Sequence, residues 1–160
     1  MYPWMSEVLE TIRQEFSDLP DAAEVTHVLV RLLAAVLLGG LLGFERETRG
    51  ASAGLRTHML VALGSALFVA TPQLAGASIE DMSRVIQGVV AGIGFLGAGA
   101  IIKLSGEGEI KGLTTAASIW LTAAIGTAAG MGRISTAVLS AVLAFIILSA
   151  LRRVSEKIAP

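Results

Sequence analysis

Apolar residues gather along the chain into long runs that short polar segments separate. A helix needs about 20 mostly apolar residues to cross the hydrocarbon core of a membrane, and each run approaches that length. The core of one water-soluble domain does not bury five such runs in 160 residues. The pattern therefore predicts five membrane-spanning helices, with connections short enough to make neighbours antiparallel. We expect the spans over residues 27–44, 57–74, 85–102, 113–130 and 134–151.

The N-terminal segment has the period of a helix but is too polar to span a membrane. Apolar residues recur at helical spacing over residues 4–19, acidic residues take the other faces, and Pro20 ends the pattern. This helix either lies in the membrane interface or packs as a cap on the membrane domain. Interfacial helices are usually basic and this one is acidic, so the pattern favours the cap. The segment lacks the basic start and short apolar core of a signal peptide, so we expect it in the mature protein.

The expected fold class is therefore all-α, a polytopic membrane bundle of five transmembrane helices plus an N-terminal amphipathic helix. The expected organisation is an amphipathic segment outside the membrane over residues 1–26, a five-span membrane domain over 27–153 and a short cytoplasmic tail over 154–160. Composition agrees, since 54% of the residues are hydrophobic and only 16% are charged, against about a quarter charged in soluble domains.

Small residues recur four apart in every span, and the third span carries the glycine-rich segment GIGFLGAG over 92–99. Membrane helices gain little from apolarity alone, because lipid tails are equally apolar, so close backbone contact through small residues replaces it. One interpretation is tight packing, with any unused ridge joining a homo-oligomer. The other is a bend or break in span three that frees backbone groups to line a polar cavity. The candidate packing or hinge positions are Gly39, Gly43, Gly88, Gly92, Gly94, Gly97, Gly99 and Gly126.

Charge placement predicts the orientation of the spans. One side of the membrane receives Arg46, Arg49, Arg56, Lys103, Lys111, Arg152, Arg153 and Lys157, and the other receives Arg13, Arg84 and Arg133. Because Lys and Arg concentrate in cytoplasmic segments, the N-terminus is expected outside and the C-terminus in the cytoplasm. The net charge of −1 gives no basic surface for nucleic acid.

Polar residues at the cytoplasmic mouth form the first candidate site. They are Glu45, Arg46, Glu47, Arg56, His58, Thr114 and Thr115. Acids add nothing to membrane anchoring, so a polar cluster with Glu45 facing Arg56 or Lys111 competes with simple positive-inside anchoring. Arg49 lies four residues after Glu45 and can pair with it along a helix. The hydroxyls near the start of span four, Ser118 included, either bond back to their own helix or bridge helices.

Asp81 and Arg84 begin span three on the outer side, three residues apart. They form either a capped, salt-bridged helix start or an ion-attracting outer gate. Arg31, one turn inside span one, must snorkel outward or pair with an acid such as Asp81, Glu24 or Glu80.

Several chemical classes are disfavoured. The chain has no cysteine, which excludes disulfides, thiolate metal sites and thiol catalysis. Neither histidine stands in a nucleophile or metal-ligand motif, so we expect neither an enzyme nor a cofactor. The acids lie at the ends of the spans and none lies at mid-span. This distribution argues against a carboxylate-based magnesium transporter and leaves a carbonyl-lined path open.

Three stretches together are more specific than composition: GFERETRGASAGLRTHMLVALGSALF at 43–68, DMSRVIQGVVAGIGFLGAGAII at 81–102 and GLTTAASIWLTAAIGTAAGMG at 112–132. In this order and spacing the chain resembles the membrane domain of the MgtC/SapB family, over about residues 28–153. The resemblance implies a five-span bacterial inner-membrane protein with an outside N-terminus, associated with growth in low magnesium and with survival of intracellular pathogens. Many members continue into a soluble ACT-like domain that this chain lacks, as in a short form or a truncated chain.

The resemblance favours a regulatory role in magnesium or energy homeostasis, through binding of membrane partners. One family member restrains the ATP synthase, so that enzyme or a magnesium transporter is an expected partner, beside the lipid bilayer and a second copy of the chain. The alternative is a magnesium transporter or channel with span three as a broken, pore-lining helix. A third class is a structural subunit of a larger membrane complex.

Overall fold

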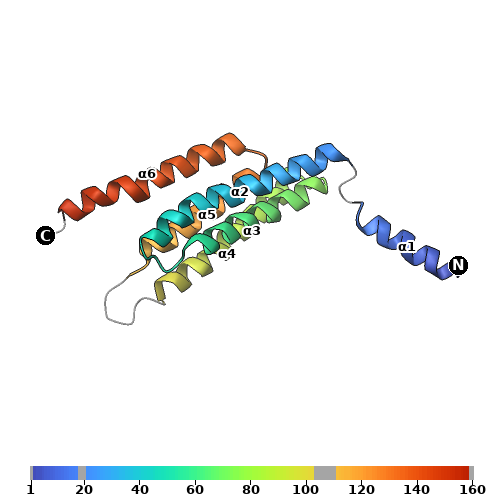
Figure 1. Ribbon diagram of the computed structural model, residues 1–160, viewed down its shortest axis with the longest axis horizontal. Helices are drawn as coiled ribbons and strands as arrows, with labels where there is room; N and C mark the ends of the chain where they lie inside the picture. Colours follow the sequence, from blue (N-terminus) through green and yellow to red (C-terminus); the bar gives the residue numbers. More distant parts are fainter. Residues whose placement is uncertain (1, 18–20, 103–110, 159–160) are drawn as a thin grey trace.

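A computed structural model of the chain describes residues 2–17, 21–102 and 111–158, and it confirms the all-α fold class. Its helices are α1 (Pro3–Glu15), α2 (Ala22–Thr48), α3 (Leu55–Leu74), α4 (Ile79–Ile102), α5 (Leu113–Gly130) and α6 (Ile134–Ile158). Short connections join α2 to α3 and α3 to α4, so these neighbours are antiparallel, as Figure 1 shows.

Within the described residues, four helices, α2 to α5, are long and apolar enough to cross a membrane. The expected fifth span appears as a shorter apolar helix over Ile134–Ala150, and α6 continues beyond it to Ile158. Helices α2 and α4 begin five and six residues earlier than expected because capping groups precede them. The Asp21 carboxylate accepts the Glu24 backbone N–H at 2.8 Å before α2, and the Ser78 hydroxyl accepts the Asp81 N–H at 3.1 Å at the start of α4.

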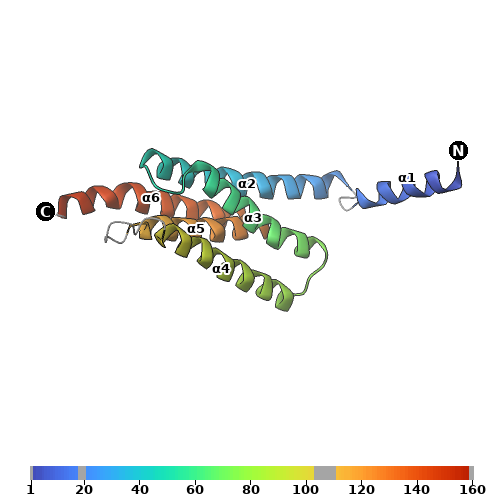
Figure 2. The same cartoon turned by 90° about the horizontal axis from the view of Figure 1, so that it is seen from below.

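The centre of the bundle is formed by α2, α3 and α5, which pack against one another. Helix α4 covers one side of α5, and α6 packs on α2 and α5 (Figures 1 and 2). The buried core is made almost wholly of alanine and a few larger residues. One buried cluster consists of Ala35, Leu42, Ala62, Ala66, Ile125, Ala129, Ala137, Ala141 and Ala144, and a second consists of Ala53, Ile93, Ile119 and Ala123. Small side chains at these positions let the helix backbones approach closely, as packing in lipid requires.

Glycines of α2 and α5 make the closest approaches to α3. A methyl group on Gly39 would lie 2.7 Å from the Ala62 Cβ, and one on Gly43 would lie 2.7 Å from the Leu55 Cα. On α5, the corresponding position of Gly126 is blocked by the backbone of Ala62. The structure thus places these three glycines at helix–helix contacts, as the packing interpretation expects.

The glycines of α4 are different. Helix α4 runs without interruption from Ile79 to Ile102, so the expectation of a bend or break in span three is wrong. Added methyl groups at Gly88, Gly92, Gly94 and Gly99 would meet nothing within 4 Å, and at Gly97 only Ala116 at 3.7 Å. Within a single chain the tight-packing interpretation therefore fails for Gly92, Gly94 and Gly99, whereas Gly97 is buried against α5. A helix keeps all its backbone hydrogen bonds internal, which apolar surroundings favour even for glycine.

Helix α1 lies apart from the bundle (Figures 1 and 2). Its apolar side chains, Trp4, Met5, Val8, Leu9 and Ile12, are exposed. The expectation that α1 caps the protein surface is therefore wrong. Its apolar face is exposed, and α1 does not pack closely on any other described helix.

Candidate functional site

Buried polar side chains gather at one end of the bundle, where α2 ends and α3 and α5 begin. This group, called the polar cluster below, consists of Glu45, Arg46, His58, Thr115, Ser118 and Thr122. The end of the bundle that contains it carries the α2–α3 connection over residues 49–54 and is called the polar end. Close packing of α2, α3 and α5 brings these three segments, which are distant in sequence, together at this end.

Glu45 is the acid at the centre of the polar cluster and is only 5% exposed. Arg46 donates from Nε to Glu45 Oε2 at 2.6 Å, and Arg49 lies 3.4 Å from Oε1. The Glu45–Arg49 pair predicted from the spacing is confirmed. The expected pairing with Arg56 is wrong, because Arg56 is exposed and the buried carboxylate is neutralised within its own helix. Burial of an ion pair is costly unless both charges are satisfied, and here each has its partner.

Glu47 has a structural task. Its Oε2 accepts the Leu55 backbone N–H at 2.7 Å. Gly54, the residue before α3, has no side chain to cap the helix, so Glu47 supplies the cap from α2. The α2–α3 turn is thereby closed by a side chain from the preceding helix.

His58 is fully buried and joins α3 to α5. Its Nδ1 lies 2.9 Å from the Gly54 carbonyl oxygen, which only accepts, so Nδ1 carries a proton. Its Nε2 lies 3.0 Å from the Ser118 hydroxyl, and that hydroxyl also lies 2.8 Å from the Thr115 carbonyl oxygen.

The single hydroxyl proton of Ser118 therefore has two acceptors. With a neutral ring, Ser118 donates to Nε2. With a protonated ring, Nε2 donates to Ser118, which then donates to Thr115. Every polar atom of this chain of hydrogen bonds is satisfied in both states.

Hydroxyls of α5 also form hydrogen bonds within their own helix, which is one of the two roles expected from the sequence. Ser118 bonds back to the Thr115 carbonyl, and Thr122 donates to the Ser118 carbonyl at 2.8 Å. Such bonds within one helix are usual for serine and threonine in membranes. Thr115 is buried, whereas Thr114 is exposed.

Thr114 stands instead at a cleft beside the polar cluster. The cleft has a volume of about 360 Å³ and lies between α5 and α6 over α2. Thr114, Ala117 and Ser118 line it from α5, and Ile147 and Leu148 line it from α6. Ser118 thus belongs both to the cleft and to the polar cluster.

Asp81 and Arg84 lie at the opposite end of the bundle, far along the chain from the polar cluster. Ser78 donates to Asp81 Oδ2 at 2.6 Å while accepting the Asp81 N–H, which is a reciprocal cap of α4. Arg84 pairs with Asp81 at 3.8 Å, and both side chains are exposed. This geometry is the capped, salt-bridged helix start.

Sequence reasoning missed the true partner of Arg31. Its Nη1 donates to the Gly130 carbonyl at 3.3 Å and lies 3.4 Å from Gln73 Oε1. The guanidinium therefore satisfies a carbonyl at the carboxyl end of α5, where a helix favours a positive charge. Of the two outcomes left open, snorkelling or an acid pair, the structure does not form the acid pair; the partners are Gln73 and a backbone carbonyl, and no spacing rule could have revealed the carbonyl. Among the described residues, no three His, Asp or Glu side chains are grouped to hold a metal ion.

Comparison with known proteins gives concordant matches. A sequence model of the MgtC family matches residues 32–157. The chain is 45% identical over 137 residues to Protein SrpB of Synechococcus elongatus, covering 79% of this chain and 75% of that protein. It is 45% identical over 129 residues to Protein MgtC of Brucella abortus, covering 80% of this chain and 52% of that protein.

A third relative, named "Putative magnesium transporter YhiD" in Escherichia coli, is 39% identical over 137 residues, covering 81% of this chain and 63% of that protein. The chain thus spans about half the length of the Brucella relative that it matches. No solved structure matches the chain significantly.

Proposed function

The chain belongs to the MgtC family, and from this premise we propose that it is a regulator of magnesium homeostasis that binds another membrane protein. Membership and apolar helices make it a multi-pass membrane protein. The name of the YhiD relative connects that protein to magnesium, which supports a magnesium-related role for this one. We place it in a bacterial inner membrane with the polar end, the C-terminus and the cleft on the cytoplasmic side, as the charge pattern predicts.

One observation carries the choice of partner binding: the cleft between α5 and α6 opens beside the polar cluster. Its lining is apolar apart from Thr114 and Ser118. A transmembrane helix of a partner fits such a surface, since apolar side chains fill the cleft while a hydroxyl orients the contact. Occupation of the cleft touches Ser118, whose bond to His58 links α5 to α3. Binding of a partner in the cleft can therefore change the hydrogen bond between α5 and α3 in the interior of the bundle.

Packing at the bundle centre also supports a binding role over conduction. Helix α2 contacts α3 directly at Gly39, and α5 contacts α3 directly at Gly126. These close contacts leave no open path between the three helices at these positions. Glu45 is held by Arg46 and Arg49 and so is engaged in the structure rather than directed at an ion.

The transporter function is the second candidate, and the name of the YhiD relative favours it. Two vesicle measurements separate the candidates. In the first, the purified chain is inserted alone into liposomes that hold a magnesium-sensitive dye. In the second, the chain is inserted together with an ATP synthase, and ATP-driven proton pumping is followed.

A regulator leaves the magnesium signal at the level of empty liposomes and lowers proton pumping. Ala117→Leu, which fills the cleft, restores pumping. Ala124→Leu is the matched control, an exposed alanine on the same helix outside the cleft, and it leaves the inhibition intact. Magnesium uptake by the inserted chain would instead establish the transporter. Unchanged pumping with no uptake would rule out this partner.

A further inference from the structure

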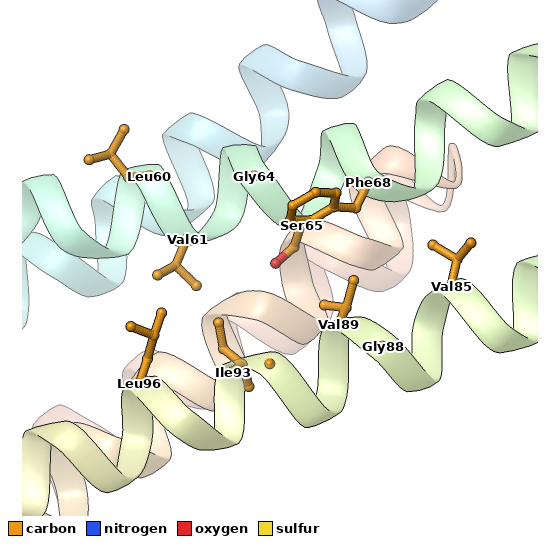
Figure 3. A pocket seen from close by; sticks show the side chains of 11 residues that line it. Leu60, Val61, Gly64, Ser65, Phe68, Val85, Gly88, Val89, Ile93 and Leu96 are labelled. Atoms are coloured by element: carbon orange, nitrogen blue, oxygen red, sulfur yellow. The ribbon is translucent and has the colours of Figure 1, made fainter.

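A groove of about 610 Å³ lies between α3 and α4, on a side of the bundle away from α6. Figure 3 shows its walls, Leu60, Val61 and Phe68 from α3 and Val85, Val89 and Leu96 from α4. The lining carries no charged side chain. The groove is therefore suited to an apolar occupant within the membrane.

Bare backbone forms part of both walls. Gly64 lies on α3, and Gly88 and Gly92 lie on α4; a methyl group on any of the three would meet nothing within 4 Å. Glycines at helix contacts elsewhere in this bundle let a backbone approach to van der Waals distance, as Gly126 does. The same residue type in an open groove leaves room for another helix to do so.

One buried polar group points into the groove. Ser65 is 3% exposed, and Figure 3 shows its hydroxyl directed from α3 toward α4. Within the described part of the chain, no hydrogen bond of this hydroxyl is found, not even to its own helix. A polar group left unpaired in apolar surroundings costs free energy. No fully buried side-chain nitrogen or oxygen of the described residues lacks a hydrogen-bond partner, so the Ser65 oxygen is open to the groove, where an occupant can pair with it.

A second polar side chain without a partner, Gln87, lies on the exposed surface of α4. It stands inside the apolar part of α4 and is exposed on the surface of the bundle. Among the described residues it has no hydrogen-bond partner either. Gln87 lies about 12 Å from the start of α4 and Ser65 about 13 Å from the end of α3, at a rise of 1.5 Å per residue. Since a short connection joins those two ends, the two residues lie at nearly the same depth in the membrane.

We propose that the groove is occupied by α4 of a second copy of this chain. A two-fold axis along the membrane normal preserves depth, so the partner's Gln87 arrives at the level of Ser65. Its amide donates to the Ser65 hydroxyl, and the symmetric contact satisfies the other pair. Gly88 and Gly92 of both copies face this interface. Of the residues of α4 whose exposure is described, only Met82, Ile93 and Gly97 are buried in the single chain, so the face of α4 turned away from α5 is open to a second copy.

A lipid acyl chain fits the groove less well. It has no hydrogen-bonding group at this depth, since the ester groups of lipids lie near the membrane surface. It also gains nothing from glycine, because a flexible chain packs equally well on leucine. A second copy meets both requirements with residues that are already present.

The first test is cross-linking in lipid vesicles. The chain has no cysteine, so single introduced cysteines report one contact each. Ala91→Cys, on the exposed face of α4 between Gln87 and Phe95, is expected to form a disulfide dimer under mild oxidation. Leu37→Cys on α2, 70% exposed to lipid, is the control and is expected to stay monomeric. Disulfide formation requires Cα atoms within about 7 Å, so collisions at distant faces do not qualify.

The second test measures association by energy transfer between labelled copies over a range of protein-to-lipid ratios. Gly92→Leu is expected to weaken association at least tenfold. Ser65→Ala and Gln87→Leu are each expected to weaken it about threefold to tenfold, as single interhelical hydrogen bonds do. The double variant should be no weaker than the weaker single one, because both remove the same bond.

An added Cβ at Gly92 meets nothing within 4 Å, so Gly92→Leu begins from open space and is expected to leave the fold of the single chain intact. Unchanged helix content and unfolding in detergent verify this. A chain that stays monomeric at all ratios overturns the proposal. So does full additivity of the Ser65 and Gln87 effects. Mass spectrometry that finds a monomer with bound lipid, lost in Gly92→Leu, would show that lipid occupies the groove instead.

Discussion

His58 connects two helices through its side chain, so its replacement should weaken the packing between them. It is fully buried, and its ring links the carbonyl of Gly54, the residue before α3, to the Ser118 hydroxyl on α5. We predict that His58→Ala lowers the free energy of unfolding by about 2–4 kcal/mol, since it leaves a cavity and removes the hydrogen bond that joins α3 to Ser118 on α5. Unfolding by SDS in mixed micelles measures this. His27→Ala, an exposed histidine on α2, is the control and should change it by less than about 0.5 kcal/mol. Equal effects would refute the bridging role.

The buried pair of Glu45 and Arg46 gives a second prediction. Removing the carboxylate strands the Arg46 guanidinium, which is only 7% exposed. Glu45→Ala should therefore cost about 3–5 kcal/mol of unfolding free energy. Arg84→Ala breaks an exposed pair with Asp81 and should cost less than about 1 kcal/mol. The same micelle titration compares them, and similar losses would mean that water reaches the Glu45 carboxylate.

Local spacing revealed some of these partners and not others. Spacing along the chain predicts two ion pairs that the structure contains. Glu45 and Arg49 are four residues apart, and Asp81 and Arg84 are three residues apart. The partner of Arg31 is the Gly130 carbonyl, 99 residues away. Backbone carbonyls carry no sequence signature, so a contact of this kind emerges only from the packing of whole helices.

At the scale of the helix, the glycines fall into two classes that predict opposite outcomes. Gly126→Ala places a methyl group against the Ala62 backbone, which cannot move aside. Separation of α3 from α5 should follow, with a loss of about 1–3 kcal/mol. Gly94→Ala meets nothing and should be neutral or stabilising by up to about 1 kcal/mol, since alanine is the better helix former. Unfolding in micelles tests the contrast, and destabilisation of both would place Gly94 at a hidden contact.

The segment GIGFLGAG shows why element type was easier to predict than element role. Its apolar length identified a membrane helix, which the structure confirms over Ile79–Ile102. The sequence could not say whether its glycines face a neighbour, a cavity or lipid, because four glycines over eight residues point to several faces. Only the position of α5 against Ile93 and Gly97 decides that Gly88 and Gly92 remain open.

For the whole molecule, the arrangement of connections makes the orientation measurable. Residues 49–54 lie at the polar end and residues 75–78 at the other. In this cysteine-free chain, Ser52→Cys should react only with a thiol reagent that reaches the cytoplasm, and Ala75→Cys only with one added outside the cells. Both positions are exposed. The reverse pattern would contradict the orientation that the Lys and Arg distribution predicts.

Helix α1 is the part of the molecule that the bundle leaves unexplained. Its apolar face is exposed, and in a membrane protein the nearest apolar phase is the lipid surface itself. We therefore predict that α1 lies in the interface, with Trp4 at the boundary between headgroups and acyl chains. In a Trp120→Phe background, Trp4 is the single tryptophan, and bromines placed near the headgroups should quench it more strongly than bromines near the bilayer centre.

Charge provides the control for that experiment. Glu7, Glu10 and Glu15 outnumber Arg13 on this helix, so anionic lipid should repel it and weaken the quenching, whereas zwitterionic lipid should not. Ile12→Ser and Phe16→Ser together reduce the apolar face without changing its charge, and they should release Trp4 to water. Quenching that is insensitive to both changes would mean that α1 is held by protein, and a second copy would then be the first candidate to examine, since the bundle of its own chain does not cover it.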